Sequence, residues 1–433
     1  MINKYEAYKD SGVEWIGVIP LSWGNVRLKL ISSITKGRKP SKDFEEFQDG
    51  LLPYLSMEYL RNKTNTPIYA DSNESNIVLV EEGDILILWD GSKSGEIVRA
   101  KKGVLSSTMA KIEIYDERFE SNYLNYLLQL GEKHIQNNTI GMGIPHVNGN
   151  ILKDLAMLLP SNQEQTQIAA YLNYQTGLID AIIEKKELLI QKLKEQRQAI
   201  INEAVTKGLN PNVPMKNSGI EWLGEIPAPW EVVKLKFLGE SITGITYSPA
   251  DVKENGLLVL RSSNIQNGEL SLNDTVYVQK EVNQKYIVQL GDILLCSRNG
   301  SRNLIGKNIM IDQRVANQTW GAFMTIFRSE FNDFLYFFFN SDIFTALSSL
   351  FLSSTINQLT IGVLNNMQIA FPKNEEERKS IIEFLTISNK KINGSINLLE
   401  IQIQKLKSYR QAIISEAVTG KIDVRDWVKT KEN

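Results

Sequence analysis

Apolar and basic residues alternate in two short stretches of the chain, "VRLKL" (26–30) and "VVKLKF" (232–237). Strict alternation places the apolar side chains on one face, so each stretch predicts a half-buried strand. Further along each half, "ILIL" (85–88) and "ILLC" (293–296) are wholly apolar, and each follows a Gly-Asp pair. A turn signal before a short apolar run predicts a fully buried strand. The segments 20–160 and 227–372 are therefore expected to be strand-rich.

The pattern changes after Pro160 and again after Pro372. No proline occurs from 163 to 207 or from 375 to 419, and apolar residues recur there at spacings of 3, 4 and 7. This periodicity predicts two long helices, each about 60 Å long, with one apolar stripe. Long isolated helices are unstable, so we expect the two stripes to pack against each other. The residues assigned to this packing are Ile179, Ile183, Leu193, Ile392, Ile396 and Leu406.

The whole chain is a tandem repeat. "SGVEWIGVIPLSW" (11–23) returns as "SGIEWLGEIPAPW" (218–230), and "QKLKEQRQAIINEAVT" (191–206) returns as "QKLKSYRQAIISEAVT" (404–419). Self-similarity of this kind identifies two homologous halves, each a strand-rich domain followed by a long helix. The fold class is therefore α+β. The four tryptophans of the two opening motifs, Trp15, Trp23, Trp222 and Trp230, are expected to anchor the start of each domain to its neighbours.

Proline and glycine in "KGLNPNVPMKNSG" (207–219) end the first helix and mark the linker between the halves. The expected division is a first domain over 1–160, a helix over 161–208, linker and second domain over 209–372, a helix over 373–420 and a tail over 421–433.

Composition narrows the class of protein. The chain has 433 residues, 42% hydrophobic and 23% charged, which is typical of a soluble globular protein with more than one core. A single cysteine, Cys296, excludes an internal disulfide framework. The N-terminus has no apolar segment typical of a signal peptide, and no apolar run is long enough to span a membrane, so we expect a cytoplasmic location.

The sequence carries no catalytic motif. Two histidines and one cysteine cannot supply a Cys/His zinc site. "GSRNLIGKN" (300–308) has the wrong glycine spacing for a phosphate-binding loop, and no G-x-G-x-x-G is present. His146 takes the place of Gln358 in the other half, so a catalytic role shared by both halves is excluded, and a surface or binding contact is favoured.

Basic residues collect in two expected loops, 25–42 and 293–309. Neither segment contains an acidic residue. Lysine and arginine can neutralise DNA phosphates, while Arg, Asn and Gln can read base edges. The alternative is a pair of solvated loops. The polar loops 141–149 and 354–360 occupy equivalent places in the two halves and could face the same partner.

Taken together, "SGVEWIGVIPLSW", "GDIL", a polar loop ending in "LP" or "FP", and the twice-written "QKLK…RQAII" resemble the specificity (S) subunit of type I restriction-modification enzymes. The resemblance covers essentially all of the chain. It implies two target recognition domains, each reading one half of a split, asymmetric sequence in double-stranded DNA. It also implies that the two helices pack as an antiparallel coiled coil, which fixes the gap between half-sites and docks methyltransferase (M) subunits, two of them.

The resemblance further implies a non-catalytic chain that binds no cofactor or metal itself. S-adenosylmethionine, ATP and Mg²⁺ are expected on the methyltransferase and restriction (R) subunits. Two rival hypotheses remain, a duplicated scaffold for a non-nucleic-acid ligand or protein partner, and a self-sufficient nuclease or methyltransferase.

The loops that the repeat places equivalently supply the candidate DNA contacts. In the first half these are Lys36, Arg38, Lys39, Ser92, Lys93 and His146. In the second half they are Thr246, Tyr247, Arg261, Asn264, Arg298, Asn299, Arg302, Asn357 and Gln358, of which Tyr247 suits a packed position equally well. Arg197 and Arg410, at equivalent places on the helices, are candidates either for internal structure or for docking the methyltransferase.

Overall fold

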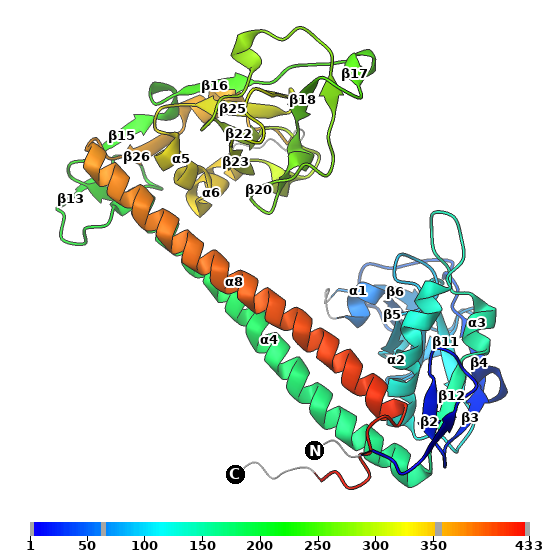
Figure 1. Ribbon diagram of the computed structural model, residues 1–433. Helices are drawn as coiled ribbons and strands as arrows, with labels where there is room; N and C mark the ends of the chain where they lie inside the picture. Colours follow the sequence, from blue (N-terminus) through cyan, green and yellow to red (C-terminus); the bar gives the residue numbers. More distant parts are fainter. Residues whose placement is uncertain (1–3, 62–65, 351–356, 429–433) are drawn as a thin grey trace. The chain divides into compact units, whose positions relative to one another are not determined.

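The structure, a computed structural model, describes residues 4–61, 66–350 and 357–428 (Figure 1). The chain divides into two compact units, one made of residues 1–186 and 401–433 and the other of residues 187–400. Two long helices, α4 (Asn162–Lys207) and α8 (Glu375–Val418), each contribute one segment to both units. Each unit therefore consists of one strand-rich domain and part of each long helix.

Unit 1 holds the first strand-rich domain. Its strands are β1 (Tyr8–Asp10), β2 (Val18–Pro20), β3 (Gly24–Arg27), β4 (Ser32–Lys36), β5 (Leu51–Leu55), β6 (Ile68–Asp71), β7 (Leu79–Val80), β8 (Ile85–Leu88), β9 (Ile97–Arg99), β10 (Gly103–Leu105), β11 (Met109–Ile114) and β12 (Ala156–Leu159). Its short helices are α1 (Met57–Leu60), α2 (Ser121–Asn137) and α3 (Gly149–Lys153).

Unit 2 holds the second strand-rich domain. Its strands are β13 (Met215–Asn217), β14 (Glu225–Pro227), β15 (Glu231–Lys234), β16 (Glu240–Thr243), β17 (Val252–Lys253), β18 (Leu257–Leu260), β19 (Ile265–Gln266), β20 (Glu269–Leu270), β21 (Tyr277–Val278), β22 (Ile293–Cys296), β23 (Asn308–Met310), β24 (Thr319–Trp320), β25 (Met324–Arg328) and β26 (Gln368–Phe371). Its helices are α5 (Asn332–Phe339), α6 (Asp342–Leu350) and α7 (Ile361–Asn366).

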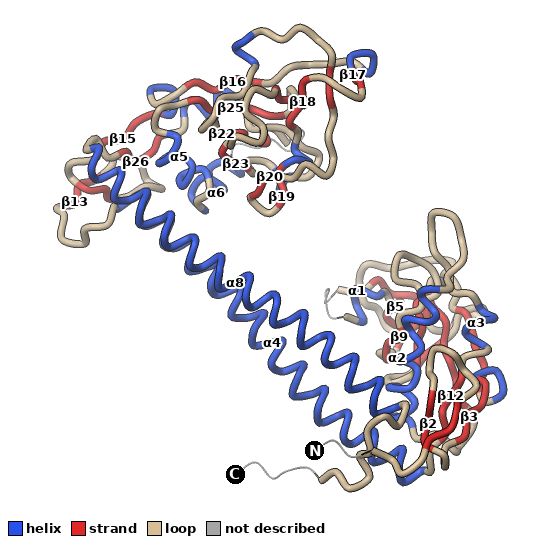
Figure 2. Tube along the Cα trace, viewed as in Figure 1, coloured by secondary structure: helices blue, strands red, loops and turns tan. Residues whose placement is uncertain are grey.

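The two domains share one sheet plan. Figure 2 shows strands (red) in both domains, and α4 and α8 as unbroken helices (blue). The order β4-β11-β8-β9 in the first domain corresponds to β16-β25-β22-β23 in the second, and both sheets are antiparallel throughout. A second sheet in each domain contains one parallel pair, β5 with β10 and β18 with β24. The sequence repeat is therefore a repeat of structure.

The Gly-Asp pair before each central strand forms a side-chain-capped turn. Gly83 and Gly291 adopt φ values of +92° and +84°, a region that glycine enters without strain. The following Asp292 accepts a hydrogen bond from the backbone N–H of Gln289, with a donor–acceptor distance of 2.8 Å. Its carboxylate also forms a two-point pair with Arg328 at the end of β25, at 2.9 and 2.6 Å. This turn fixes the start of the buried strand β22.

The first domain repeats this turn with a weaker ion pair. Asp84 accepts a hydrogen bond from the backbone N–H of Glu81 at 2.9 Å, and Lys111 of β11 lies 3.0 Å from its carboxylate. Lysine offers a single ammonium group where arginine offers a two-pronged donor. Both turns lead into strands whose residues are buried throughout, as the apolar runs predicted.

Two of the four motif tryptophans, one in each domain, connect their domain to the first turn of a long helix. Trp23 is fully buried, and its indole N–H donates to Glu164 in the first turn of α4 at 3.2 Å. Trp230 is buried in the same way and donates to Glu377 in the first turn of α8 at 2.9 Å. The anchoring role is therefore confirmed for these two residues, whereas Trp222 is 41% exposed, which is a correction to the expectation.

Two further points differ from the sequence prediction. β3, which contains Val26, ends at Arg27, and β15, which contains Val233, ends at Lys234. A 3₁₀ turn follows each strand. As a result Leu30 and Phe237 are 62% and 72% exposed rather than half-buried. Two helices that the hydrophobic pattern did not predict, α2 and the aromatic α5, also pack inside the domains.

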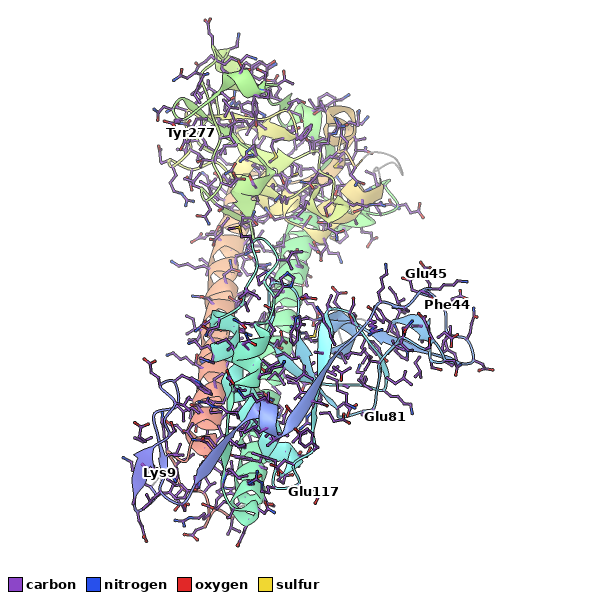
Figure 3. All side chains as sticks on the ribbon, turned by 90° about the vertical axis from the view of Figure 1, so that its right-hand side faces the viewer. Lys9, Phe44, Glu45, Glu81, Glu117 and Tyr277 are labelled. Carbon is purple, nitrogen blue, oxygen red and sulfur yellow. The ribbon has the colours of Figure 1, made fainter. Side chains whose placement is uncertain are left out.

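The outer edge of unit 1 is formed by the loop after β4. Phe44 exchanges backbone hydrogen bonds with Tyr69 of β6 at 2.9 and 2.8 Å. Figure 3 shows Phe44 and Glu45 on the side of this unit away from its helices. None of the helices in the described ranges combines the length and apolar character that crossing a membrane requires.

Candidate nucleic-acid interface

The loops that follow β8 and β22 carry equivalent backbone bridges with different side chains. In the first domain Asp90 bridges His146, and in the second domain Arg298 bridges Gln358. These four residues occupy matching places in the sequence repeat. One backbone framework therefore presents an acid and a histidine in one domain, and an arginine and an amide in the other.

In the first domain, the carboxylate of Asp90 is paired with neighbouring side chains. The carboxylate of Asp90 lies 2.6 Å from Nδ1 of His146 and 3.0 Å from Nζ of Lys36. Burial alone would raise the pKa of Asp90, but the hydrogen bonds from His146 and Lys36 outweigh burial and lower it. The ammonium of Lys36 also lies 5.7 Å from the centroid of the Trp89 ring. The structure thus brings two of the candidate residues, Lys36 and His146, together at one carboxylate.

The basic segment 25–42 is not one loop, as the sequence suggested, because it forms β3, a 3₁₀ turn, β4 and the loop after β4. Its other basic residues differ in whether they bond within the chain. Arg27 donates to the carbonyl of Asp154 at 2.7 Å, and Lys29 forms an ion pair with the Asp154 carboxylate at 2.7 Å. Arg38 and Lys39 are exposed, and neither side chain bonds to any residue in the described part of the chain. The loop therefore keeps two cations available to an anionic partner.

Ser92 and Lys93 lie at a different feature of unit 1, a polar cavity of about 560 Å³. Its walls include Glu132 of α2 and Arg410 of α8. Burial raises the pKa of Glu132 to about 7. A hydrogen bond from the backbone N–H of Ile97 acts in the opposite direction, but its effect is smaller than that of burial. Ser92 and Lys93 are both exposed, so they remain available for contact.

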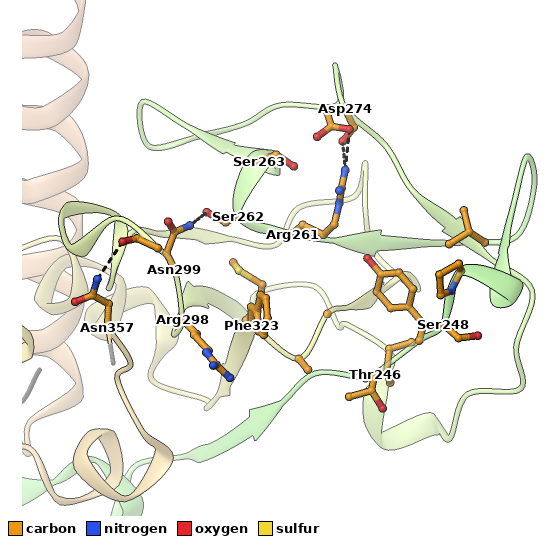
Figure 4. A pocket seen from close by; sticks show the side chains of 18 residues that line it. Thr246, Ser248, Arg261, Ser262, Ser263, Asp274, Arg298, Asn299, Phe323 and Asn357 are labelled. Atoms are coloured by element: carbon orange, nitrogen blue, oxygen red, sulfur yellow. Dashed lines mark hydrogen bonds and ion pairs between the residues drawn. The ribbon is translucent and has the colours of Figure 1, made fainter. Parts of the chain in front are cut away.

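The second domain contains an open cavity of about 1290 Å³ that gathers most of its candidates (Figure 4). The candidate residues that line it are Thr246, Tyr247, Arg261, Arg298, Asn299 and Asn357. Asn299 donates to the hydroxyl of Ser262 at 3.0 Å, and Asn357 donates to the carbonyl of Gly300 at 3.0 Å. Tyr247 is partly buried in this wall, while Thr246 is exposed.

Three candidates of the second domain lie outside the cavity. Asn264 is fully buried, and its amide donates to the carbonyls of Ser271 and Asp274 at 3.0 and 2.9 Å. It holds the loop together and cannot reach a base in this conformation, so its assignment as a DNA contact is corrected. Arg302 donates to the carbonyl of Ser349 at 2.8 Å, and Gln358 is exposed beside Arg298.

Sequence reasoning missed several residues that shape both sites. Asp90 and Asp274 carry no sequence signal for a DNA contact, because carboxylates and phosphates are both negative, yet each forms an ion pair with a candidate cation. Phe323 is 59% exposed under the Arg298 guanidinium, whose carbon lies 5.2 Å from the ring centroid. No local pattern links residues 25 positions apart in sequence, but the β22–β25 pairing brings them together.

The helix residues assigned to packing are buried at four positions, Ile179, Ile183, Ile392 and Ile396, and partly buried at Leu193 and Leu406. Both helix arginines make contacts between α4 and α8. In unit 1 Arg410 pairs with Asp180 at 2.9 and 3.2 Å, and in unit 2 Arg197 donates to Asn393 at 2.9 Å. Asp180 and Asn393 are equivalent in the repeat, so both arginines have a structural role.

No group of three or more His, Cys, Asp or Glu side chains suited to a metal ion is found within residues 4–61, 66–350 and 357–428. Beside the carboxylates of Asp90 and Asp274, the candidate sites contain cations, amides, hydroxyls and exposed aromatic rings. Cations, amides and hydroxyls are groups that proteins use on phosphates and on base edges.

Comparison with known proteins identifies the family. Residues 20–192 and 227–405 match the family described as type I restriction modification DNA specificity domain. The MjaVIII type I restriction enzyme specificity subunit of Methanocaldococcus jannaschii is 33% identical, over 94% of this chain and 95% of the relative. The EcoBI type I restriction enzyme specificity subunit of Escherichia coli is 25% identical, over 63% of this chain and 60% of the relative.

A solved chain from work on complex assembly and conformational transition of the type I R-M system shares the fold. Its TM-score is 0.68 at 16% identity, and the match covers 93% of this chain and 99% of that chain. The family match covers one segment in each half, and the two segments together make up most of the sequence. The chain therefore belongs to the type I restriction-modification specificity subunits.

Proposed function

We propose that this chain is the DNA sequence-specificity subunit of a type I restriction-modification complex, and that each strand-rich domain reads one half of a two-part target. The supporting observation is the pair of equivalent bridges, Asp90 with His146 and Arg298 with Gln358. Family membership supports DNA as the ligand, and the duplication supports two readers. We take 1–160 and 209–372 as the limits of the two recognition domains.

The two half-sites are expected to differ in sequence. A carboxylate held by a lysine and a histidine presents different hydrogen-bonding groups from an arginine on an aromatic ring. Base edges in the major groove differ in their donors and acceptors, so unlike side chains select unlike base pairs. A palindromic target would need equivalent side chains at equivalent positions, and the chain does not have them.

We further propose that α4 and α8 pair as an antiparallel coiled coil that sets the gap between half-sites. Within unit 1, Asp180 contacts Arg410 and Lys186 contacts Gln402, so the position on α8 falls as the position on α4 rises. This direction of pairing is the one that two helices related by a two-fold axis would have. The isoleucine stripe supplies the buried side chains of the pairing.

The exposed apolar residues of the long helices support docking of methyltransferase subunits. Leu188 and Ile401 occupy equivalent places in the repeat and are 56% and 45% exposed. Leu189 beside Leu188 and Leu398 near Ile401 are exposed as well, at 47% and 56%, and apolar residues that gather on an exposed surface suit contact with a protein partner. We propose one methyltransferase subunit for each half, with restriction subunits joining the complete complex. S-adenosylmethionine, ATP and Mg²⁺ would act on those partners, and this chain would be non-catalytic.

The test is a band-shift experiment with the purified chain, alone and with the methyltransferase subunits encoded beside it. Retardation of duplex DNA is expected, and its affinity should fall steeply with added salt. A double variant, Arg38→Ala with Lys39→Ala, should reduce the salt slope by about 2, because each exposed cation releases about one counterion. A chain that retards no DNA in either preparation refutes the proposal and favours a scaffold for another ligand. Methyl transfer by the chain alone would refute its non-catalytic role.

A further inference from the structure

The cavity of the second domain contains two cations whose surroundings differ. Among its described lining residues, Arg261 and Arg298 carry positive charge and Asp274 carries negative charge. The remaining lining is neutral, formed by hydroxyls, amides, small and aliphatic residues, Met324 and the aromatic rings of Tyr247 and Phe323. The function of the cavity depends on which of the two arginines is available to a ligand.

Arg261 is committed to an internal ion pair. Its Nη2 lies 2.8 Å from the carboxylate of Asp274, and its side chain is 29% exposed. Figure 4 shows Arg261 directed toward Asp274 at the rim of the cavity. Hydrogen bonds from Arg261 lower the pKa of Asp274, so the carboxylate stays charged and the pair stays neutral overall. Arg261 therefore organises the wall.

The backbone and ring contacts of Arg298 fix its position, but they do not use the N–H donors of its guanidinium. Its backbone N–H donates to the carbonyl of Phe323 at 3.0 Å, and its backbone bridges Gln358. Its guanidinium stacks on Phe323, 5.2 Å from the ring centroid, and bonds to no acceptor in the described part of the chain. Stacking occupies the face of the guanidinium and leaves the N–H groups at its edge free.

We propose that Arg298 reads a guanine in the half-site bound by the second domain. A guanidinium edge donates two parallel hydrogen bonds, and guanine presents two acceptors, O6 and N7, in the major groove. The Phe323 ring limits the orientations of Arg298 before DNA binds, which reduces the entropy lost on binding. This inference rests on the proposed function and adds the identity of one base and the residue that selects it.

The first domain lacks this reader at the equivalent place. Asp90 replaces Arg298 there, and its carboxylate is enclosed by Lys36 and His146. The base pair that faces this position in the first half-site is therefore not selected by an arginine fork. The asymmetry of the target at this point follows from the exchange of Arg298 for Asp90, on a backbone bridge where Gln358 is also exchanged for His146.

The experiment uses the chain in complex with its methyltransferase subunits and a library of random duplexes. Bound duplexes are sequenced for the wild-type chain and for Arg298→Lys, Arg298→Ala and Arg302→Ala. Lysine keeps the charge of residue 298 but loses the two-pronged donor, so it separates base reading from attraction to phosphate. Arg302 is the matched control, an exposed arginine four positions away that lies outside the cavity.

The wild-type chain should select a two-part motif with a guanine in one part. Arg298→Lys and Arg298→Ala should lower discrimination at that guanine about 10- to 100-fold and leave the other positions unchanged. Arg302→Ala should weaken binding evenly across sequences. An unchanged motif in the folded Arg298→Lys complex overturns the inference and leaves the proposed function intact. A wild-type complex that selects no sequence overturns both, and thermal melting of each variant checks that it is folded.

Discussion

The turn before β22 can be tested by removing its buried carboxylate. Asp292 is 3% exposed and pairs with Arg328, whose side chain is 24% exposed. Asp292→Ala leaves the guanidinium without its partner and also removes the acceptor for the Gln289 N–H. Breaking a buried pair from one side costs about 3–5 kcal/mol. Because Arg328 keeps some contact with solvent, we take the lower value of about 3 kcal/mol.

The single cysteine supplies the assay. Cys296 is fully buried in β22, four residues after Asp292, so a thiol reagent reaches it only when unit 2 opens. When closing is faster than labelling, the labelling rate is proportional to the opening equilibrium. A loss of about 3 kcal/mol therefore predicts labelling about 150-fold faster in Asp292→Ala than in the wild-type chain.

The matched control is Asp84→Ala, the equivalent change in the other half. The Asp84 side chain is 25% exposed, against 3% for Asp292, and the Asp84–Lys111 pair lies in unit 1. This variant should lose about 1 kcal/mol of unit 1 stability and leave Cys296 labelling unchanged. If Asp292→Ala labels at the wild-type rate, or if both variants accelerate labelling equally, the assignment of Asp292 to the stability of unit 2 is wrong.

Three further predictions concern other parts of the chain. Burial raises the pKa of Glu132 from 4.5 to about 7, so the folded state holds an extra proton between these values. Unit 1 should therefore lose up to about 3 kcal/mol as pH rises through this window, and Glu132→Gln should remove the slope in denaturant titrations at several pH values. A slope retained in the variant would contradict the assignment. Trp230→Ala should cost about 3–5 kcal/mol of unit 2 stability by chemical denaturation, while Trp222→Ala should change it by less than about 0.5 kcal/mol. Equal effects would refute the anchoring role of Trp230. Seven residues inserted before Gln191, with a matching insertion after Leu398, should lengthen the selected gap between half-sites by about three base pairs, because each helix grows by about 10 Å. An unchanged gap would show that the helices do not set it.

The tandem fold could be predicted because its determinants are local and written twice. Repetition of the opening motif and the apolar runs "ILIL" and "ILLC" indicated equivalent domains and buried strands, and the structure confirms both. The long helices were predictable from their periodicity and from the absence of proline. The alternation after Val26 predicted a strand that continues to Leu30, but the strand ends at Arg27 and a 3₁₀ turn follows. Leu28 would be buried in either structure, so the two differ only in the exposure of Leu30.

The candidate site could be predicted only in part, because its chemistry depends on contacts between distant residues. Sequence identified Arg298 as a candidate, but its availability depends on Phe323 and on the commitment of Arg261 to Asp274. Asn264 looked equally suitable in sequence, yet its loop folds back and uses the buried amide to satisfy backbone carbonyls. Residue type indicates what a side chain can do, and tertiary pairing decides which side chains remain free to act.

The most direct test of the account is to map methylated bases in the genome of cells that produce this chain with its methyltransferase subunits. Two different recognition domains on one spacer predict methylation at a single two-part motif, with unlike half-sites separated by a fixed gap. Cells that lack only this chain should show no methylation at that motif. Methylation at an uninterrupted palindrome, or at the same sites without the chain, would contradict the claim that its two domains choose the target.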